Sequence, residues 1–369
     1  MTGHGKIKVL VVDDSALMRQ LLSAILAEDP AIEVVGAAVN PLIAREKIKA
    51  LKPDVLTLDV EMPGMDGITF LQNLMRLRPM PVVMVSSLTE KGADATLRAL
   101  ALGAVDFVTK PQSGLREGMQ ALVDEICGKV RAAARAHVRS LPPIAAPPAA
   151  TPAALAGTHM LREQVVVMGA STGGTQAITE ILTMLPEQCP GIAIVQHMPP
   201  KFTALFAGHL DQQCALEVRE ARDGERLGWG VALIAPGGRQ MELVKDSDGY
   251  AVRVYDGAPV NMHRPSVDVL FESAARCAGR NALGIILTGM GGDGARGLRA
   301  MKEAGAHTIA QDEATSVIFG MPEQAIRLGG AREVARLERI AGNIVRWVGI
   351  PAQHEPSSGT DAAQTPVSG

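Results

Sequence analysis

The chain has 369 residues, of which 47% are hydrophobic and 20% charged, as in soluble globular proteins. This length exceeds that of one ordinary hydrophobic core and predicts two domains. A net charge of −3 and an aromatic content of 3% argue against a nucleic-acid partner, which would require a basic face or a stacking platform. No apolar run reaches the roughly 18 residues needed to cross a bilayer, so no membrane insertion is expected.

The four cysteines are scattered and form no C-x-x-C pair; they are Cys127, Cys189, Cys214 and Cys277. This spacing favours reduced thiols over a disulfide framework or a zinc site. The N-terminal apolar run 7–12 leads directly into two aspartates and does not resemble a secretory signal. We therefore expect a cytoplasmic protein.

The first third of the chain alternates between short apolar runs and helix-period segments. Strands are expected at 7–12, 32–39, 54–58, 81–86 and 105–109, with helices such as 15–28 and 66–76 between them. Strands rich in Val, Ile and Leu are typical of parallel sheets that helices cover on both faces. Residues 1–130 are therefore predicted to form a doubly wound α/β domain.

Residues 131–160 are predicted to contain the end of a helix and then a tether. The stretch LPPIAAPPAATPAALAG at 141–157 is almost all Ala and Pro, a composition typical of extended, semi-stiff linkers. Residues 351–369 are rich in Ser, Pro, Ala and Gln and are predicted to be disordered.

The α/β pattern resumes over residues 161–350 and predicts a second doubly wound, Rossmann-like domain. Its expected strands are 165–168, 192–196, 231–235 and 283–288, and its expected helices include 175–185 and 266–277. One interruption differs, because Asp248-Gly249 between the runs 241–244 and 251–255 predicts an antiparallel hairpin.

Polar residues follow four of the predicted strands in the first domain. Asp13 and Asp14 follow the first strand, Asp59 the third, Ser86 the fourth and Lys110 the fifth. The carboxyl ends of parallel strands meet at one edge of a sheet, so these side chains should converge. Clustered carboxylates suit Mg²⁺, and a lysine beside them suits a phosphoryl group on Asp59. Each residue alone could instead cap a helix or form an ordinary turn.

The segments that carry these residues resemble response-regulator receiver domains, which have a flavodoxin-like fold. They are VVDDS at 11–15, TLDVEMPGMDG at 57–67, VVMVSS at 82–87 and DFVTKP at 106–111. The resemblance implies that Asp59 is phosphorylated and that Mg²⁺ is held by Asp13, Asp14, Asp59 and the carbonyl of Glu61. It also implies that Ser86 and Phe107 are switch residues and that Lys110 contacts the phosphoryl group.

The segment 165–182 predicts a strand, a glycine-rich turn and a helix. Residues 169–173 match G-x-S-x-G, a sharp turn that exposes a nucleophilic serine, here Ser171. A dinucleotide-binding G-x-G-x-x-G loop fits poorly, because Ser171 occupies the second glycine position. His197 follows the strand 192–196 and Asp293 follows the strand 283–288, so the three side chains could converge as nucleophile, base and orienting acid.

Each member of this trio also has a structural interpretation. His197 could be a core or capping residue, and Asp293 could be the N-cap of a helix over 294–304. The order Ser, His, Asp along the chain differs from the order Ser, Asp, His of α/β-hydrolases, which predicts a different topology.

The wider sequence resembles the chemotaxis response-regulator protein-glutamate methylesterase family. The matching segments are GASTGGT at 169–175, QHMPP at 196–200, HRPSVDVLF at 263–271, ILTGMGGDGARGL at 286–298 and FGMPEQAI at 319–326. The resemblance implies catalysis by Ser171, His197 and Asp293, with backbone N–H groups near Thr172 and Met290 holding the oxyanion. Gln240 and Lys201 depart from the family pattern, which often has histidine and glycine there.

The resemblance further implies substrates, partners and regulation. The substrates would be methylated glutamates and glutamines of methyl-accepting chemoreceptors, and the phosphodonor would be a chemotaxis histidine kinase. Phosphorylation would release a receiver that covers the catalytic face of a monomer. No metal or cofactor is expected in the esterase site.

Several alternatives stay open from the sequence. His263 and Arg264 could line a substrate groove, or 263–268 could simply begin a helix with Ser266 as its N-cap. The second domain could be a non-catalytic scaffold or a nucleotide-binding module, whereas its lack of a basic face disfavours a DNA-binding helix-turn-helix.

Overall fold

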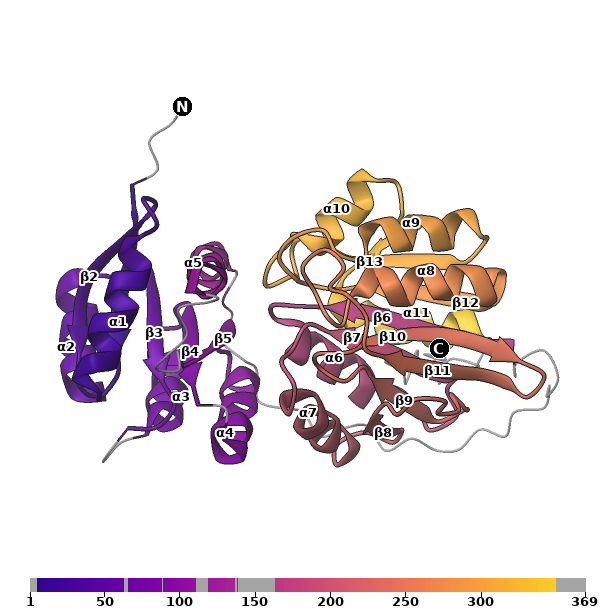
Figure 1. The fold of residues 1–369 in the computed structure, drawn as a ribbon, viewed down its shortest axis with the longest axis horizontal. Coiled ribbons are helices and arrows are strands. Elements are labelled where there is room, and N and C mark those ends of the chain that lie inside the picture. Colours follow the sequence, from indigo (N-terminus) through magenta and orange to yellow (C-terminus); the bar gives the residue numbers. More distant parts are fainter. Residues whose placement is uncertain are drawn as a thin grey trace, which may run out of the picture.

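The structure is a computed structural model that describes residues 5–62, 66–87, 89–110, 119–136, 138 and 163–349. The predicted Ala/Pro-rich stretch and the predicted disordered tail lie outside the described residues. The described residues form two α/β units that lie side by side (Figure 1). No helix in these ranges is long and apolar enough to cross a membrane.

The first unit is a five-stranded parallel sheet in the order β2-β1-β3-β4-β5, the flavodoxin-like arrangement predicted from the sequence. Its strands are β1 (Ile7–Val12), β2 (Ile32–Ala38), β3 (Val55–Asp59), β4 (Val82–Ser86) and β5 (Asp106–Thr109). Its helices are α1 (Ala16–Ala27), α2 (Pro41–Leu51), α3 (Gly67–Leu77), α4 (Glu90–Ala101) and α5 (Met119–Ala134). Helices α1 and α5 cover one face, and the other three helices cover the opposite face.

The second unit has a seven-stranded parallel sheet in the order β14-β13-β12-β6-β7-β9-β8. Its strands are β6 (Val165–Ala170), β7 (Ile192–Gln196), β8 (Glu217–Glu220), β9 (Val231–Ile234), β12 (Ala282–Ile286), β13 (His307–Gln311) and β14 (Glu333–Ala335). The predicted hairpin is confirmed as the antiparallel pair β10 (Gln240–Asp246) and β11 (Gly249–Tyr255).

Helices cover both faces of this second sheet, as a doubly wound fold requires. They are α6 (Gly174–Thr183), α7 (Phe202–Asp211), α8 (Val267–Cys277), α9 (Ala295–Glu303), α10 (Met321–Arg327) and α11 (Leu337–Val348), with a short 3₁₀ turn η2 (Gly279–Asn281). Helices α6, α7 and α11 pack on one face, and α8, α9 and α10 pack on the other.

Strand β6 lies at the point where the strand order reverses. The chain runs from β6 through α6 to β7 on one side, whereas β12 pairs with β6 on the other side. Open α/β sheets bind ligands in the crevice at the carboxyl ends of strands beside such a point. The turns after β6, β7 and β12 therefore form the expected place for a site.

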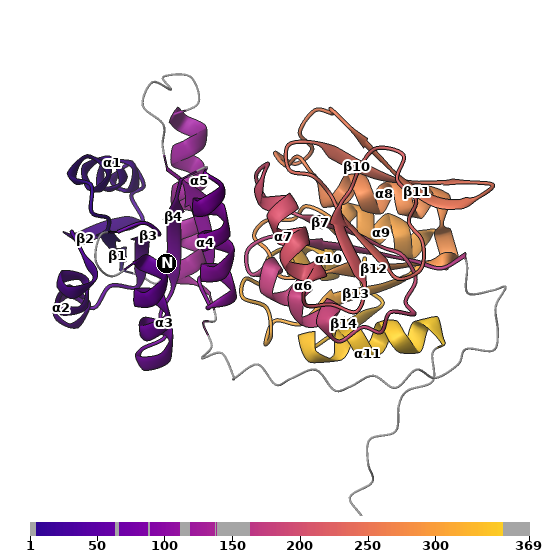
Figure 2. The same ribbon diagram turned by 90° about the horizontal axis from the view of Figure 1, so that it is seen from below.

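The two units contact each other where α4 packs against α6 and α7 (Figures 1 and 2). The first two residues of β5, Asp106 and Phe107, also contact the second unit. Phe107 stacks on Phe202, with their ring centroids 4.5 Å apart. The Gln176 amide donates a hydrogen bond to the carbonyl of Leu100. These contacts place the first unit against α6 and α7, the helices that follow β6 and β7 at the crevice of the second unit.

A close approach of β6 to α8 generates a prediction about stability. A Cβ atom on Gly169 would lie 2.1 Å from Cγ1 of the buried Val267, so Gly169→Ala overpacks the base of the site. We expect the free energy of unfolding to fall by about 1–3 kcal/mol. Gly208→Ala is the control, because nothing lies within 4 Å of the added methyl group in helix α7. Chemical denaturation should show no loss for the control; a Gly169→Ala variant as stable as the wild type would contradict this packing.

Candidate active site

Ser171 lies in the turn between β6 and α6, and backbone contacts hold this turn in place. Its N–H donates to the carbonyl of Thr288 at 3.0 Å, and its carbonyl accepts from Gly174 N–H at 2.7 Å. Gln196 Nε2 donates to the same carbonyl at 2.9 Å. Gly173 has a φ of 78°, a left-handed conformation that glycine adopts without strain. The turn therefore presents the Ser171 side chain in one direction.

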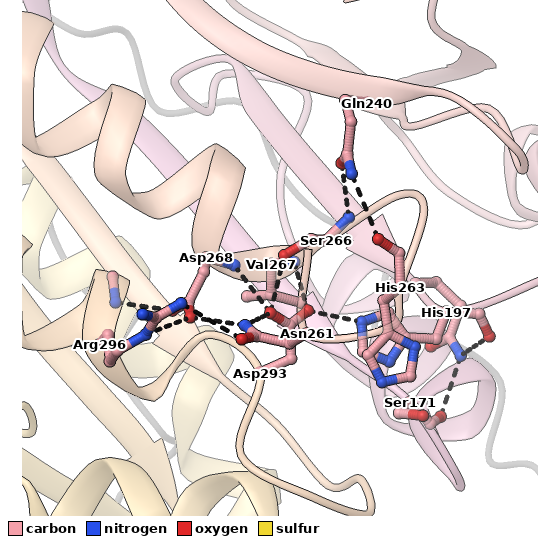
Figure 3. Close-up of polar contacts among 12 residues, drawn as sticks. Ser171, His197, Gln240, Asn261, His263, Ser266, Val267, Asp268, Asp293 and Arg296 are labelled. Atoms are coloured by element: carbon pink, nitrogen blue, oxygen red, sulfur yellow. Dashed lines mark hydrogen bonds and ion pairs between the residues drawn. The ribbon is translucent and has the colours of Figure 1, made fainter. Parts of the chain in front are cut away.

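His197 and Asp293 meet beside Ser171 (Figure 3). His197 Nε2 lies 2.8 Å from Asp293 Oδ2. Because an ionised carboxylate only accepts hydrogen bonds, Nε2 carries the proton and Nδ1 holds the lone pair. Nδ1 is buried without a hydrogen-bond partner, so no hydrogen bond joins it to the Ser171 hydroxyl beside it. The nitrogen that remains free can thus take a proton from the neighbouring hydroxyl.

Asp293 is bound at the N-terminus of helix α8. Its carboxylate accepts hydrogen bonds from the N–H of Val267 at 2.7 Å, the hydroxyl of Ser266 at 2.7 Å and the amide of Asn261 at 2.6 Å. Burial opposes its charge, but the bonds from His197, Asn261 and Ser266 outweigh burial and hold the pKa of Asp293 well below its usual range. Asp293 is therefore a fixed anion that can orient His197.

The helix-capping interpretations from the sequence need correction. Helix α9 begins at Ala295 after Gly294, and it has no side-chain cap, so Asp293 does not cap it. Ser266 does occupy the N-cap position of α8, but its hydroxyl makes no cap bond and donates to Asp293 instead. The first N–H group of α8 donates instead to Asp293, which lies in the loop after β12. The sequence alone does not reveal this long-range cap.

His263 forms a second layer over His197. The two imidazole rings are stacked, with centroids 3.7 Å apart. Burial, and then the neighbouring His197, lower the pKa of His263 to about 4, so His263 is neutral at physiological pH. Arg264 lies on the surface and donates to the carbonyl of Gly257 at 3.1 Å. The structure brings His263 to the site and leaves Arg264 at its edge.

The loop 289–292 contains Met290 and lies next to the first unit. A cavity of about 670 Å³ is lined by this loop and by helix α5, and its lining includes Arg131, Arg135 and Met290. Within the described residues, the backbone N–H groups of Thr172 and Met290 donate to no protein acceptor. The Thr172 hydroxyl donates to the Asp106 carboxylate of the first unit. Both N–H groups thus remain available to a developing oxyanion.

The first unit has a separate acidic pocket at the carboxyl ends of its strands. Oxygen atoms of Asp13, Asp14 and Asp59 lie within 4.8 Å of one another. Lys110 Nζ lies 2.8 Å from Asp59 Oδ2 and 3.7 Å from Asp13 Oδ2. Burial raises the pKa of Asp59 to about 6, with the Lys110 bond opposing the rise and Asp13 adding to it.

The donor set of this pocket fits a hard divalent cation. Asp13 Oδ2 is buried without a hydrogen-bond partner, and burial raises the pKa of Asp13. A cation bound there would satisfy this oxygen and stabilise both carboxylates as anions. The Glu61 N–H donates to Asp59 Oδ1 at 3.2 Å, which places the backbone of Glu61 beside the pocket.

The two predicted switch residues, Ser86 and Phe107, are both buried. Ser86 is buried, and its hydroxyl donates to the carbonyl of Gly92 at the start of α4 at 3.0 Å. Phe107 is buried against Phe202 of the second unit.

Comparison with known proteins places both units in families. Residues 166–344 match the CheB methylesterase family, and residues 9–122 match the response regulator receiver domain. A protein-glutamate methylesterase/protein-glutamine glutaminase from Salmonella typhimurium (strain LT2) is 56% identical over 336 residues, covering 91% of this chain and 95% of the relative. The chain belongs to the CheB methylesterase family. The corresponding protein of Enterobacter cloacae is 57% identical over 335 residues, covering 91% of this chain and 95% of its own length.

Two solved structures correspond to the two units. The CheB methylesterase catalytic domain of Thermotoga maritima is 37% identical, covers 50% of this chain and 97% of its own, and has a TM-score of 0.49. The response regulator domain of Thermotoga maritima CheB is 48% identical, covers 35% of this chain and 97% of its own, and has a TM-score of 0.32.

The two departures from the CheB family pattern have different structural settings. Lys201 is exposed at the start of α7 with a φ of 75°, a conformation in which glycine is less strained. Gln240 is buried, and its amide donates to the carbonyls of Ala258 at 3.0 Å and His263 at 3.2 Å. Gln240 also accepts from the N–H of Ser266 at 2.9 Å. Gln240 therefore holds the loop that carries His263.

The raised pKa of Asp59 generates a prediction about pH. Lys110→Ala removes the cation that favours the Asp59 anion, so the Asp59 pKa should rise above 6. The pKa of Asp59 in the folded chain lies above its usual value of 3.8, so the stability that Asp59 contributes is fully present below pH 3.8 and is lost as pH rises to about 6. The variant should lose more stability at pH 8 than at pH 5.

Carbon-13 NMR of the Asp59 carboxyl and denaturation at the two pH values would measure both effects. Lys49→Ala, on the exposed surface of α2, is the control and should change neither. If the titration midpoint of the Asp59 carboxyl is the same in Lys110→Ala and in the wild type, the ion pair does not set this pKa.

Proposed function

We propose that the chain is a hydrolase in which Ser171, His197 and Asp293 demethylate glutamate methyl esters and deamidate glutamines on chemoreceptors. Membership of the CheB family makes it a protein-glutamate methylesterase and protein-glutamine glutaminase with a receiver domain. The observation that carries the catalytic assignment is the 2.8 Å contact of His197 with Asp293 beside the Ser171 turn.

The proposed reaction begins with the Ser171 hydroxyl. Its proton passes to His197 Nδ1 while Oγ forms a bond to the carbonyl carbon of the γ-methyl ester. The N–H groups of Thr172 and Met290 donate to the resulting oxyanion, and each such donor is worth about 3–4 kcal/mol. Asp293 stabilises the imidazolium that forms and keeps its ring in place.

The intermediate then collapses in two steps. The methoxy oxygen takes the proton from His197 as the bond between this oxygen and the carbonyl carbon breaks. Methanol departs, and an acyl group remains attached to Ser171. Water gives a proton to His197 and adds to the acyl carbon, and Ser171 leaves with that proton, which regenerates the enzyme and yields glutamate. A primary amide at the same position loses ammonia, so one site carries out both activities.

The receiver pocket supports phosphorylation of Asp59. Asp13, Asp14, Asp59 and the Glu61 carbonyl would hold Mg²⁺, which when bound neutralises negative charge on the incoming phosphoryl group. Lys110 contributes a second positive charge next to Asp59. A chemotaxis histidine kinase is the proposed phosphodonor.

The contacts between the units support control by the receiver. The receiver carboxylate of Asp106 accepts a hydrogen bond from Thr172, the residue after the nucleophile. Phe107 stacks on Phe202 at the start of α7. A phosphoryl group adds about −1.5 to −2 charge at Asp59 and can shift such an interface. We infer that phosphorylation loosens the receiver and admits the methyl-accepting chemoreceptor, and that the enzyme acts as a cytoplasmic monomer in chemotactic adaptation.

Removing the proposed nucleophile should separate catalysis from signalling. Ser171→Ala should reduce methanol release from methylated receptor to background, because the hydroxyls of Thr172 and Ser266 are bonded to Asp106 and Asp293 and cannot replace Oγ. Phosphorylation of Asp59 by a small-molecule phosphodonor should persist. Ser247→Ala, in the exposed turn of the hairpin, should keep full activity. Substantial methanol release by Ser171→Ala would reject the assignment.

Removing the receiver tests the proposed inhibition. A chain that lacks residues 1–150 loses the Asp106 contact and the Phe107 stack, so its unstimulated methanol release should rise several-fold. Adding Ser171→Ala to the shortened chain is the control and should remove that activity. An unchanged or lower rate in a folded, shortened chain would refute autoinhibition.

A further inference from the structure

Asn261 lies between two buried carboxylates (Figure 3). Its amide nitrogen donates to Asp293 Oδ1 at 2.6 Å and to Asp268 Oδ2 at 2.8 Å. Asp293 is 2% exposed and Asp268 is 1% exposed, so both charges depend on protein donors. The Asn261 amide thus donates one hydrogen bond to Asp293 and one to Asp268, and it separates two carboxylates that would otherwise repel each other.

The orientation of this amide is determined by its surroundings. Arg296 Nη2 donates to the Asn261 carbonyl oxygen at 3.2 Å, and Arg296 Nε donates to Asp268 Oδ2 at 3.2 Å. The reversed amide would place its oxygen against two carboxylates and its NH₂ group against a guanidinium. Only the observed orientation satisfies all three neighbours.

The turn that carries Asn261 also carries His263. Val260 and His263 close the turn with two backbone hydrogen bonds, of 3.0 and 2.9 Å. Asn261 and Met262 both have left-handed backbones, with φ of 50° and 67°, and asparagine tolerates this conformation better than most residues. The Met262 side chain points away and is 89% exposed. This short turn thus contacts Asp293 through Asn261 and covers His197 through His263.

We propose that Asn261 is a positioning residue of the esterase, which fixes Asp293 with Oδ2 toward His197 and limits how strongly Asp293 attracts a proton on that imidazole. The proposal rests on the catalytic roles proposed above for Ser171, His197 and Asp293. Asn261 acts through Asp293 and does not touch the reacting atoms.

The direction of the expected effect follows from charge. A hydrogen bond to Asp293 Oδ1 disperses the negative charge of the carboxylate, so its loss leaves Oδ2 a stronger partner for the His197 imidazolium. The other ionisable groups around the pair are His263, Asp268, Arg296 and, from receiver helix α5, Lys129. A substitution at position 261 removes none of these groups; Asp268 and Arg296 lose their hydrogen bonds to Asn261 but keep their ion pair with each other. The imidazolium therefore persists to higher pH, and the acid limb of the rate profile moves upward.

Two variants of Asn261 and one control test the proposal in the full-length chain. Asn261→Gly removes the amide and suits the left-handed backbone. Asn261→Asp keeps the shape and replaces the donor by a carboxylate. Met262→Gly is the matched control, because it changes the adjacent left-handed position and removes a side chain that faces solvent.

The measurement is the pH dependence of kcat/KM for methanol release from methylated chemoreceptor, with a phosphodonor present. For Asn261→Gly we expect kcat to fall about tenfold, the effect of one hydrogen bond to a charged group, with KM nearly unchanged. The midpoint of the acid limb should rise in the order wild type, Asn261→Gly, Asn261→Asp. Met262→Gly should match the wild type in both respects.

The outcomes separate this proposal from the one on which it rests. If Ser171→Ala is inactive but both Asn261 variants keep the wild-type midpoint, Asn261 has at most a structural role and the inference is overturned. A loss of kcat that Met262→Gly reproduces also overturns it. If Ser171→Ala remains active, the catalytic assignment itself has failed, whatever the Asn261 variants show.

Discussion

The site depends on one buried charge, the Asp293 carboxylate at the N-terminus of helix α8. A carboxylate that is 2% exposed is strongly destabilised unless donors surround it, and here five N–H, O–H or imidazole groups do so. These donors come from the loop after β7, from the turn at Asn261 and from the start of α8. Their common acceptor therefore holds together segments that are far apart along the chain. The same bonds keep Asp293 ionised, which is the state that orients His197.

The receiver contains a second pair of buried carboxylates, Asp13 and Asp59, which have fewer hydrogen-bond donors around them than Asp293 has. Asp59 has a pKa of about 6 and Asp13 has an oxygen without a hydrogen-bond partner, so a cation bound there would stabilise both carboxylates. The esterase site has the opposite character, because its acid is fully bonded. The carboxylates proposed to bind a cation and a phosphoryl group thus have few donors, whereas the carboxylate proposed to orient His197 has five. The Phe107–Phe202 stack and the Asp106–Thr172 bond connect the two units.

Much of the fold could be predicted from the sequence, because apolar periodicity and glycine-rich turns are local signals. The predicted strands of both units and the Asp248-Gly249 hairpin are confirmed, with ends displaced by at most two residues. The site required long-range contacts that no spacing encodes. No sequence pattern indicates a role for Asn261, because it lies in an irregular loop and contacts Asp293 only in the folded chain. The capping of α8 by a residue 26 positions away was missed for the same reason.

We propose that His197 activates Ser171 and that Asp293 orients this histidine. Labelling with a serine-reactive phosphonate, followed by peptide mass analysis, tests this most directly because it needs no receptor substrate. The account predicts a single label on Ser171, its loss in His197→Ala and much slower labelling in Asp293→Asn. Labelling of Ser171 at the wild-type rate without His197 would contradict it, as would an active enzyme whose label lies on another residue.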